Sequence, residues 1–340
     1  MINTIAIYLL VNITVLFLCG KISYRLKLLD LPNKRKIHSK ATPFTGGIAL
    51  SVIFLFSIVL FDSFNPNLSL ILSMGFLISI VGLIDDKYNL NIGGKLCLQI
   101  IPIFYLIFFE NFSLSEIGDY GSFNLDLGTF SIPFTLLSVL FLINAFNYFD
   151  GIDGILSVTS ISTLSILYFL VVQENHYLIL TQNTEFFLII ITIPIIIFLF
   201  FNFSILKLPK IFLGDSGSLL LGYIISFILI FFASEKLIHP ILLAWSVAIF
   251  TYEFLSINII RLKNNQKLFK PGQDHLHHII LRKTKSTLIT NLLIALLNII
   301  LFTSGYISYI FFSELVSLFL FIILFLIFLF FRNTYSKKLI

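Results

Sequence analysis

The stretch that decides the fold is Ser216–Ser234, SGSLLLGYIISFILIFFAS, a run of 19 residues without a charged side chain. A helix rises about 1.5 Å per residue, so this run would extend about 28 Å as a helix. That length matches the roughly 30 Å hydrocarbon core of a bilayer. We therefore predict a membrane-spanning helix here, entered directly from the charged residue Asp215.

The whole chain repeats this pattern. Its 340 residues are 58% hydrophobic and 11% charged, whereas soluble proteins are about a quarter charged. This composition excludes soluble, disordered and disulfide-framework proteins. The runs lack the two-residue alternation of a membrane β-barrel, so helices are expected. We predict an all-α polytopic membrane protein with a single domain, 1–340, and eleven spans: Met1–Gly20, Ala41–Phe61, Ser63–Ile84, Leu96–Phe109, Leu127–Phe149, Gly154–Gln173, Phe186–Leu206, Ser216–Ser234, Leu237–Tyr252, Ser286–Ser313 and Leu315–Phe331.

The charged residues predict the orientation of these spans. With eleven spans, 21 of the 22 Lys and Arg residues fall on one side and only Lys236 on the other. The positive-inside rule then places the N-terminus outside and the C-terminus in the cytoplasm. The longest outer loop, Glu110–Ile132, alternates apolar and polar residues, which predicts a small β-hairpin on the outer face.

Polar residues that could support chemistry gather in five predicted cytoplasmic loops, at about 21–43, 85–95, 144–154, 207–215 and 261–285. We expect these loops to form an active site. For the first loop alone, a basic surface that holds anionic lipid headgroups is an alternative interpretation.

Carboxylates and amides occur at three predicted span ends. Asp85 and Asp86 are adjacent, and their mutual repulsion favours a bound cation or a raised pKa. A second set recurs every three residues, which predicts one helical face that meets a cavity, a metal or a ligand. The third is Asp215, which reads both as a helix N-cap and as a Mg²⁺ ligand beside free amides. The recurrent set is Asn144, Asn147, Asp150 and Asp153.

The fifth loop contains Asp274-His275-Leu-His277-His278. Zinc binding is an open alternative, but the surrounding Lys and Arg residues favour phosphate recognition. Taken together, carboxylates for a metal and cations for phosphate charge indicate Mg²⁺-assisted phosphoryl transfer at the membrane surface. The chain lacks a P-loop, which argues against an ATP-driven pump.

Five motifs resemble the polyprenyl-phosphate N-acetylhexosamine-1-phosphate transferases of glycosyltransferase family 4, the bacterial group that includes WecA, TagO and MraY. They are DLPNKRKIH with a following GG, GLIDDKYNL, NAFNYFDGIDG, FLGDSGS and HLHH, in family order between Asp30 and about Arg282. The RKxH element is similar to the WecA and TagO branch. The resemblance implies a bacterial inner-membrane enzyme with a cytoplasmic active site, which initiates cell-envelope glycan synthesis such as that of lipopolysaccharide or cell wall.

The implied reaction transfers N-acetylglucosamine-1-phosphate, or a related N-acetylhexosamine-1-phosphate, from a UDP-sugar to undecaprenyl phosphate and releases UMP. The resemblance implies Mg²⁺ as cofactor, with Mn²⁺ as an alternative. It also implies contact with membrane lipids, no nucleic acid, and an option of a homodimer. Direct attack by the acceptor phosphate is our preferred mechanism over a covalent aspartyl intermediate.

Carried over motif by motif, the resemblance assigns roles to residues in all five loops. Asp215 is the expected Mg²⁺ ligand, with Asp85 and Asp86 as further metal ligands or as the base for the lipid phosphate. Phe212 is expected to stack on uracil. Asp150 and Asp153 are expected in the catalytic nucleotide pocket with Asn147, supported by Asn144, with Lys95 as a further substrate-binding residue. Diphosphate or acceptor phosphate is expected to be held by Arg35, Lys36, His38, His275, His277 and His278.

One position departs from the family pattern. The related proteins carry an Asp three residues before the first histidine of the HLHH motif, whereas this chain has Gly272 there and Asp274 directly before His275. The departure leaves the role of Asp274 open.

A multispan transporter that couples ions through its cytoplasmic carboxylates is the alternative function. A transporter is expected to place charges near the bilayer midplane in broken helices. Here the charges lie at predicted span ends, and Glu253 is the one acid well inside a predicted span. The sequence therefore favours the enzyme.

Overall fold

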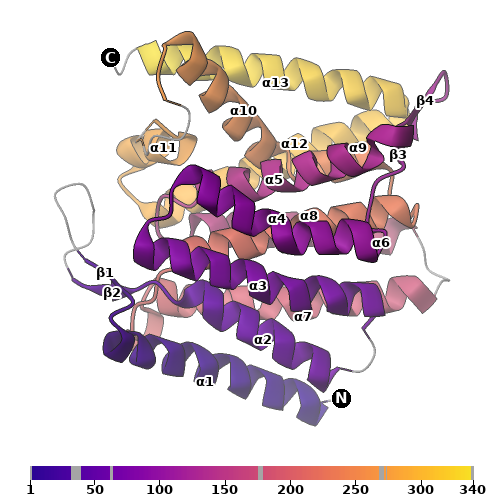
Figure 1. The fold of residues 1–340 in the computed structure, drawn as a ribbon. Helices are drawn as coiled ribbons and strands as arrows, with labels where there is room; N and C mark the ends of the chain where they lie inside the picture. Colours follow the sequence, from indigo (N-terminus) through magenta and orange to yellow (C-terminus); the bar gives the residue numbers. More distant parts are fainter. Residues whose placement is uncertain are drawn as a thin grey trace.

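The computed structural model describes residues 2–31, 40–61, 64–174, 179–267, 272 and 274–337, which form a bundle of long helices lying side by side (Figure 1). Within these residues, nine helices are long and apolar enough to cross a membrane. They are α1 (Ile2–Leu26), α3 (Pro66–Tyr88), α4 (Ile92–Phe109), α5 (Ser131–Phe149), α6 (Ile155–Glu174), α7 (Ile179–Asn202), α8 (Gly214–Ser234), α12 (Thr287–Phe311) and α13 (Glu314–Lys337).

Three further segments complete the bundle. Helices α9 (Pro240–Ser246) and α10 (Ala248–Lys263) form a broken pair bent by 72°, which together pass as a tenth candidate span. Helix α2 (Gly46–Leu60) is apolar but has 15 residues, about 22 Å of helix, which is shorter than the hydrocarbon core. Each predicted run overlaps one of these helices or the broken pair. The prediction of a helical bundle with many membrane-length helices is confirmed, but the described part of the chain contains nine or ten candidate spans, not eleven.

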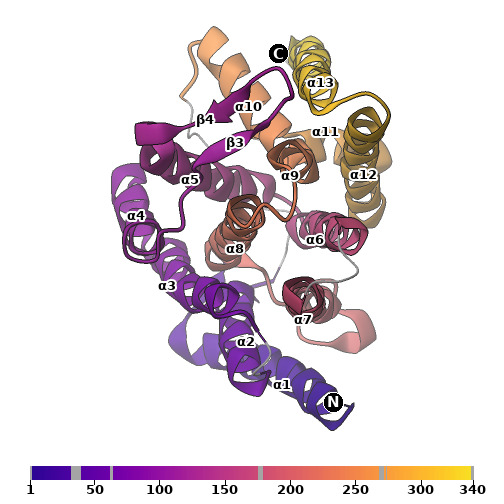
Figure 2. The same cartoon turned by 90° about the vertical axis from the view of Figure 1, so that its right-hand side faces the viewer.

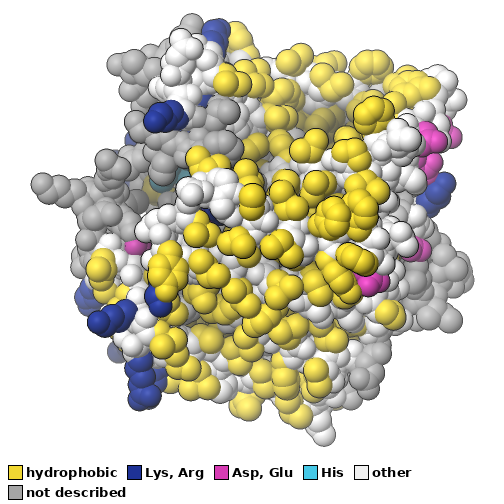
Figure 3. All heavy atoms as spheres, in the orientation of Figure 1, with side chains coloured by type: hydrophobic (Ala, Val, Ile, Leu, Met, Phe, Trp, Pro, Cys, Tyr) yellow, Lys and Arg dark blue, Asp and Glu magenta, His cyan; other side chains and the backbone are white. Residues whose placement is uncertain are grey.

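Charge separates the two ends of the bundle. In Figure 3 an apolar band covers the middle, Lys and Arg side chains gather at the left end, and Asp and Glu side chains gather at the right end. The described chain begins near the acidic end and finishes near the basic end (Figure 1). This is the distribution that the loop charges predicted.

Two short antiparallel strand pairs lie at opposite ends of the bundle (Figure 1). Strands β3 (Glu116–Asp119) and β4 (Asn124–Asp126) pair at the acidic end, which confirms the predicted hairpin. Strands β1 (Leu29–Asp30) and β2 (Thr42–Pro43) pair at the basic end. The sequence analysis missed this second pair because two-residue strands carry no alternating pattern.

Helix α8, which contains the apolar run Ser216–Ser234, lies at the centre of the bundle (Figure 2). Its entire apolar stretch is buried against neighbouring helices. A helix that is apolar on every side is expected to have neighbours on every side. Helices α2, α3, α5, α6 and α9 pack against α8, and the first turn of α8 lies at the basic end of the bundle.

Glycines allow α2 and α3 to approach this first turn closely. A Cβ atom at Gly47 of α2 would lie 1.9 Å from the backbone nitrogen of Gly217, and one at Gly82 of α3 would lie 2.4 Å from Cα of Ser216. The amides of Gly46 and Gly47 also donate to the carbonyls of Phe212 and Leu213, at 3.0 and 2.9 Å. Small residues permit such backbone contact between membrane helices, so the paired glycines fix how the loop before α8 meets α2.

The break between α9 and α10 is stabilised by side chains from other helices. The Ser246 carbonyl at the break accepts hydrogen bonds from Thr163 Oγ1 at 3.0 Å and Asn298 Nδ2 at 3.4 Å. Asn298 also donates to Ser162 Oγ at 3.0 Å. A backbone carbonyl released by a break in an apolar environment needs such partners, which explains these buried polar side chains in α6 and α12.

We expect Gly82→Ala to destabilise the protein by about 1–3 kcal/mol, because the added methyl would overlap the backbone of α8. Gly93→Ala is the matched control, since its Cβ would lie 3.7 Å from the nearest neighbour. Thermal unfolding of both variants in detergent measures the difference. Equal melting temperatures for the two variants would show that the α3–α8 contact tolerates a side chain.

Candidate active site

A cavity of about 1020 Å³ opens at the basic end of the bundle. Its walls come from the end of α3, the loop between α5 and α6, the loop before α8, and α11 (Leu276–Thr284) with the segment before it. Five of the predicted site carboxylates contribute to its lining. Among the predicted site residues, those that line it are Asp85, Asp86, Asp150, Asp153, Phe212, Asp215 and His278.

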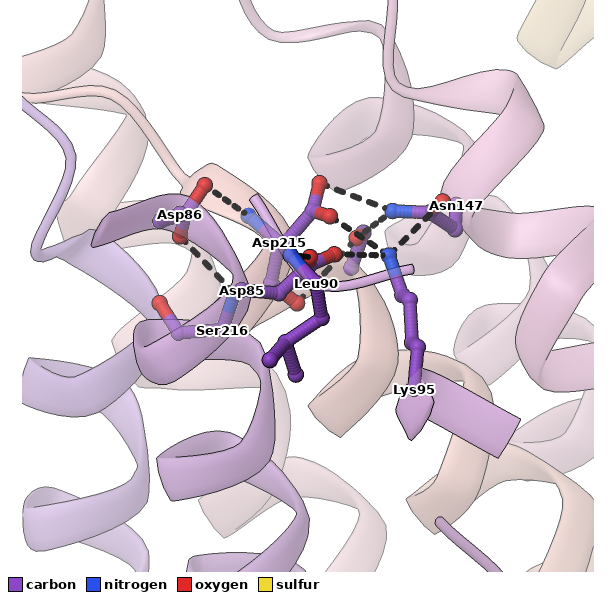
Figure 4. A network of polar contacts seen from close by, with 8 residues as sticks. Asp85, Asp86, Leu90, Lys95, Asn147, Asp215 and Ser216 are labelled. Atoms are coloured by element: carbon purple, nitrogen blue, oxygen red, sulfur yellow. Dashed lines mark hydrogen bonds and ion pairs between the residues drawn. The ribbon is translucent and has the colours of Figure 1, made fainter. Parts of the chain in front are cut away.

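Lys95 lies at the centre of the polar network beside this cavity (Figure 4). Its ammonium group lies 2.6 Å from Asp85 Oδ2 and 2.5 Å from Asp215 Oδ2. It also donates to Asn147 Oδ1 at 3.4 Å, and Asn147 Nδ2 donates to Asp215 Oδ1 at 2.9 Å. One cation therefore joins carboxylates from α3 and α8 to an amide from α5, so the three helix ends are cross-linked electrostatically.

Asp86 caps the helix that carries Asp215. Its Oδ1 and Oδ2 accept from the backbone amides of Asp215 and Ser216, at 3.1 and 3.3 Å. The first amides of a helix lack partners within the helix and favour negative charge. Gly214, at φ +72°, turns the chain into α8, and a Cβ there would lie 2.6 Å from Asp86 Oδ2. The glycine of the FLGDSGS motif thus leaves room for a carboxylate cap from another helix.

The loop after α5 places Asp150 and Asp153. Helix α5 ends at Phe149, so the predicted helical face includes Asn144 and Asn147 but does not continue through the two aspartates. Instead a turn carries Asp150 and Asp153 into the cavity wall. Asn144 Nδ2 donates to Leu140 O of its own helix at 2.7 Å.

Asp150 and Asp153 have different surroundings. Asp153 forms a 2.5 Å ion pair with Lys210, whose ammonium also lies 5.1 Å from the ring centre of Phe212. Burial raises the pKa of Asp150 to about 8, and the negative charges of Asp215 and Asp153 add to this effect. At neutral pH Asp150 therefore holds a proton, and a cation that enters the cavity would compete with that proton.

The three predicted histidines do not share one position. His278 lines the cavity, whereas His277 is fully buried behind Gly151, where a Cβ atom would lie 2.0 Å from His277 Nε2. His275 lies nearly buried, with Nδ1 3.7 Å from Glu253 Oε1. Burial, together with the charges of His275 and Arg282, lowers the pKa of His278 to about 4, so this side chain is a neutral hydrogen-bonding group at pH 7.

The structure explains the departure at Gly272. Asp274 makes a two-point ion pair with Arg261, through Nε–Oδ2 at 3.1 Å and Nη2–Oδ1 at 2.9 Å. A Cβ atom at Gly272 would lie 2.2 Å from Asp274 Oδ1 and 2.9 Å from Arg261 Nη2. The ion pair therefore occupies the space that a side chain at 272 would need, and Asp274 holds Arg261 while Gly272 lines the cavity.

Several residues around the cavity were missed or cannot be placed. The sequence indicated no individual role for Lys210 or Ser218. In the structure Lys210 pairs with Asp153, and Ser218 Oγ accepts from Asn147 Nδ2 at 2.8 Å. Spacing along the chain held no signal for these contacts, because they join residues that lie far apart in the sequence. The predicted phosphate-binding residues Arg35, Lys36 and His38 lie outside the described residues.

The predicted metal site involves Asp215 and the neighbouring carboxylates Asp85 and Asp86. Among the described residues, no three His, Cys, Asp or Glu side chains lie close enough to enclose a metal ion, and Lys95 lies between Asp85 and Asp215. The oxygen donors nevertheless suit Mg²⁺, which usually takes one or two protein carboxylates and completes its shell with water and substrate phosphates. Burial is the main cause of the raised pKa of Asp150, and the negative charges of Asp215 and Asp153 add to it, so several carboxylates act on one another in this cavity. Asp215 and the neighbouring carboxylates thus fit the ion as a partial shell.

Fold and cavity together define a polytopic helical membrane protein with an acid-rich site at one end of its bundle. A family model described as "Glycosyl transferase family 4" matches residues 68–233. That interval runs from α3 to α8 and contains Asp85, Asp86, Lys95 and Asp215.

Relatives extend the match over most of the chain. The undecaprenyl-phosphate alpha-N-acetylglucosaminyl 1-phosphate transferase of Salmonella typhi is 30% identical over 282 residues, 82% of this chain and 75% of that protein. The proteins of the same name from Pasteurella multocida (strain Pm70) and Escherichia coli O157:H7 are both 29% identical. They cover 92% and 78% of this chain, and 87% and 72% of their own lengths. The chain belongs to glycosyl transferase family 4, which confirms the resemblance seen in its motifs.

We expect Asp150→Asn to change how stability depends on pH. In the folded protein Asp150 keeps its proton up to about pH 8, against 3.8 in the reference state, so the folded chain binds the extra proton in this window. Stability supplied by this carboxyl therefore falls as the pH rises from about 4 to about 8. Melting temperatures of the wild type and Asp150→Asn in detergent should diverge toward pH 8 in favour of the variant. Parallel curves would contradict the raised pKa.

Proposed function

We propose that the protein transfers a sugar-1-phosphate from a UDP-N-acetylhexosamine to undecaprenyl phosphate and releases UMP. The single observation that carries this proposal is the Lys95 network. There one ammonium joins Asp85, Asp215 and Asn147 beside a cavity lined with further carboxylates. Family membership supports the same activity, because the relatives are named for N-acetylglucosaminyl 1-phosphate transfer to undecaprenyl phosphate.

In the proposed reaction, an oxygen of the acceptor phosphate attacks the phosphorus next to the sugar of the donor diphosphate. The new P–O bond forms as the bond to the UMP oxygen breaks, and UMP leaves with that electron pair. No other reactant is needed. Phosphoryl transfer depends chiefly on positioning and on countering negative charge, and Lys95 and Lys210 are the described cations in ion pairs with the site's aspartates.

The cavity offers separate groups to donor and acceptor. Phe212 presents an aromatic ring on the cavity wall, suited to stacking on uracil, and lies beside Asp153 and Lys210. Asp86 is engaged by the amides of α8 and Asp85 by Lys95. Their roles are thus to hold α8 and the lysine in place for the incoming phosphates.

Mg²⁺ is part of this proposal. Asp215 would hold it, with Asp85 and Asp86 nearby, and bound Mg²⁺ would neutralise charge on the diphosphate. The supporting observations are the oxygen-rich lining of the cavity and the raised pKa of Asp150. Mn²⁺, which favours the same oxygen ligands, is the natural substitute.

The orientation proposed is that of an inner-membrane protein with the cavity facing the cytoplasm. The cavity opens at the end where the Lys and Arg side chains seen in Figure 3 gather, and the positive-inside rule assigns that end to the cytoplasm. UDP-sugars are soluble cytoplasmic molecules, whereas undecaprenyl phosphate is held in the bilayer. A site at the basic end of the spans meets both, and N-acetylglucosamine-1-phosphate is the proposed group transferred.

The direct test is an assay of UMP release by the purified protein. It uses several UDP-sugars, undecaprenyl phosphate and Mg²⁺, with omission of each component as a control. We expect UMP with a UDP-N-acetylhexosamine only when acceptor and metal are present. If no donor yields UMP, the transferase proposal fails, and the multispan transporter becomes the better hypothesis.

Asp215→Asn is expected to abolish turnover while the protein stays folded in detergent. The substitution keeps the side-chain shape and its contact with Asn147 but removes the charge that pairs with Lys95 and would bind metal. UMP release and the melting temperature are measured on the same preparation. Normal turnover by this variant would overturn the metal assignment.

Lys95→Met is expected to lower kcat/KM by about 10²–10³-fold, the usual cost of losing a group that stabilises transition-state charge. Lys87→Met is the matched control, because Lys87 is an exposed cation at the end of α3, a few residues before Lys95 in the sequence. That control should stay within about twofold of the wild type, since a lone surface charge contributes little. Equal losses in the two variants would mean that only the overall charge of this end matters.

A further inference from the structure

Arg332 is a buried cation on an otherwise exposed helix. Helix α13 is the least buried of the described candidate spans, and the neighbouring side chains of Phe330 and Phe331 are 68% and 57% exposed. The Arg332 side chain is 4% exposed. Charged side chains at the edge of a membrane normally turn toward water, so an inward arginine needs specific partners.

Its partners are the residues from which the histidine helix α11 begins. Arg332 Nη2 donates to Glu253 Oε1 at 3.1 Å and to the backbone carbonyl of Asp274 at 2.7 Å. The same Glu253 oxygen accepts from the amide of Leu276, the first residue of α11, at 2.8 Å. Glu253 is 1% exposed and lies on α10. The buried pair thus fastens the start of α11 to both α10 and α13.

The start of α11 depends on these contacts because the residue at its own N-cap position does not cap it. His275, at the N-cap position, makes no side-chain hydrogen bond to the first turn. Helix ends without a cap are unsatisfied, and α11 has only nine residues, too short to be stable alone. Glu253 takes over the capping of the Leu276 amide, and Arg332 holds Glu253 and the preceding carbonyl in place.

The fastened helix forms part of the cavity wall. His277 packs behind Gly151, next to Asp150, and His278 lines the cavity itself. A shift at the start of α11 would therefore move His278 and loosen the loop that carries Asp150.

We propose that Arg332 is a positioning residue that sets α11, and with it His278 and the Asp150 loop, for the transfer reaction. The proposal rests on the proposed function for its consequence in catalysis. Arg332 touches neither substrate nor reacting atoms; it acts through Glu253 and the Asp274 carbonyl. Neither the family model, which ends at residue 233, nor the motifs drew attention to it.

The first test is hydrogen exchange of the full chain in detergent, which does not depend on catalysis. Arg332→Met should speed the exchange of α11 amides by about tenfold or more, the effect of losing a charge-assisted hydrogen bond. Amides of α8 should be unchanged. Lys263→Met is the control, because Lys263 is an exposed cation at the end of α10. Unchanged exchange in α11 would overturn the proposal.

The second test is turnover. We expect kcat/KM for UMP release to fall about tenfold or more in Arg332→Met, because small misplacements of site groups are costly. Arg332→Lys, which keeps a charged donor, should recover part of the loss. Full activity in Arg332→Met would contradict the proposal, and so would the absence of any rescue by lysine.

A double variant separates positioning from simple destabilisation. Arg332→Met leaves the buried Glu253 without its cation, which by itself is destabilising. In Glu253→Gln/Arg332→Met that charge is gone, yet the bond to the Asp274 carbonyl is still missing. We expect a melting temperature near that of Glu253→Gln alone, with turnover still about tenfold lower than in that single variant. Turnover equal to that of Glu253→Gln would refute a positioning role for Arg332. If the wild type itself releases no UMP, the proposed function fails and the exchange experiment alone decides on Arg332.

Discussion

The contact between α3 and the first turn of α8 is the constraint on which the site depends. At Gly82 the backbones meet so closely that no side chain fits between them. One turn further along α3, the chain presents Asp85 and Asp86 to the start of α8. Asp86 then caps α8, and Asp85 shares Lys95 with Asp215. If α3 were displaced by the width of a methyl group, the cap and the shared cation would both be lost.

Two carboxylates and one ammonium group lie close together in this site. Asp85 and Asp215 come from different helices and would repel each other without Lys95. Lys95 also donates to Asn147 of α5, so this amide contributes to the charge balance of the site. Among the described residues no cation pairs with Asp150, whose pKa is raised chiefly by burial. Positive charge is thus concentrated near Asp215, and the side of the cavity near Asp150 could accommodate a further cation.

Much of this molecule could be predicted from its sequence, and the reasons are physical. Apolar runs of membrane length have only one regular conformation open to them in lipid, so the helices follow from Ser216–Ser234 and its counterparts. The structure places residues from separate span-end motifs around one cavity, among them Asp85, Asp153 and Asp215. Short or broken elements were harder: α2 is too short for a full span, and the α9–α10 bend depends on Asn298, far away in sequence.

What could not be predicted is which polar side chains face each other. His277 and His278 are neighbours in the sequence, yet one is buried behind Gly151 and the other lines the cavity. Lys210 and Arg332 resembled ordinary basic residues at span ends, because their partners Asp153 and Glu253 lie far away in the sequence. The bond between Arg332 and the Asp274 carbonyl also has a consequence for biosynthesis. The histidine helix can reach its final place only after the ribosome has made residue 332 and α13 has entered the membrane. The cavity wall at α11 is thus completed by a segment that is synthesised well after the helices that carry Asp85, Lys95 and Asp215.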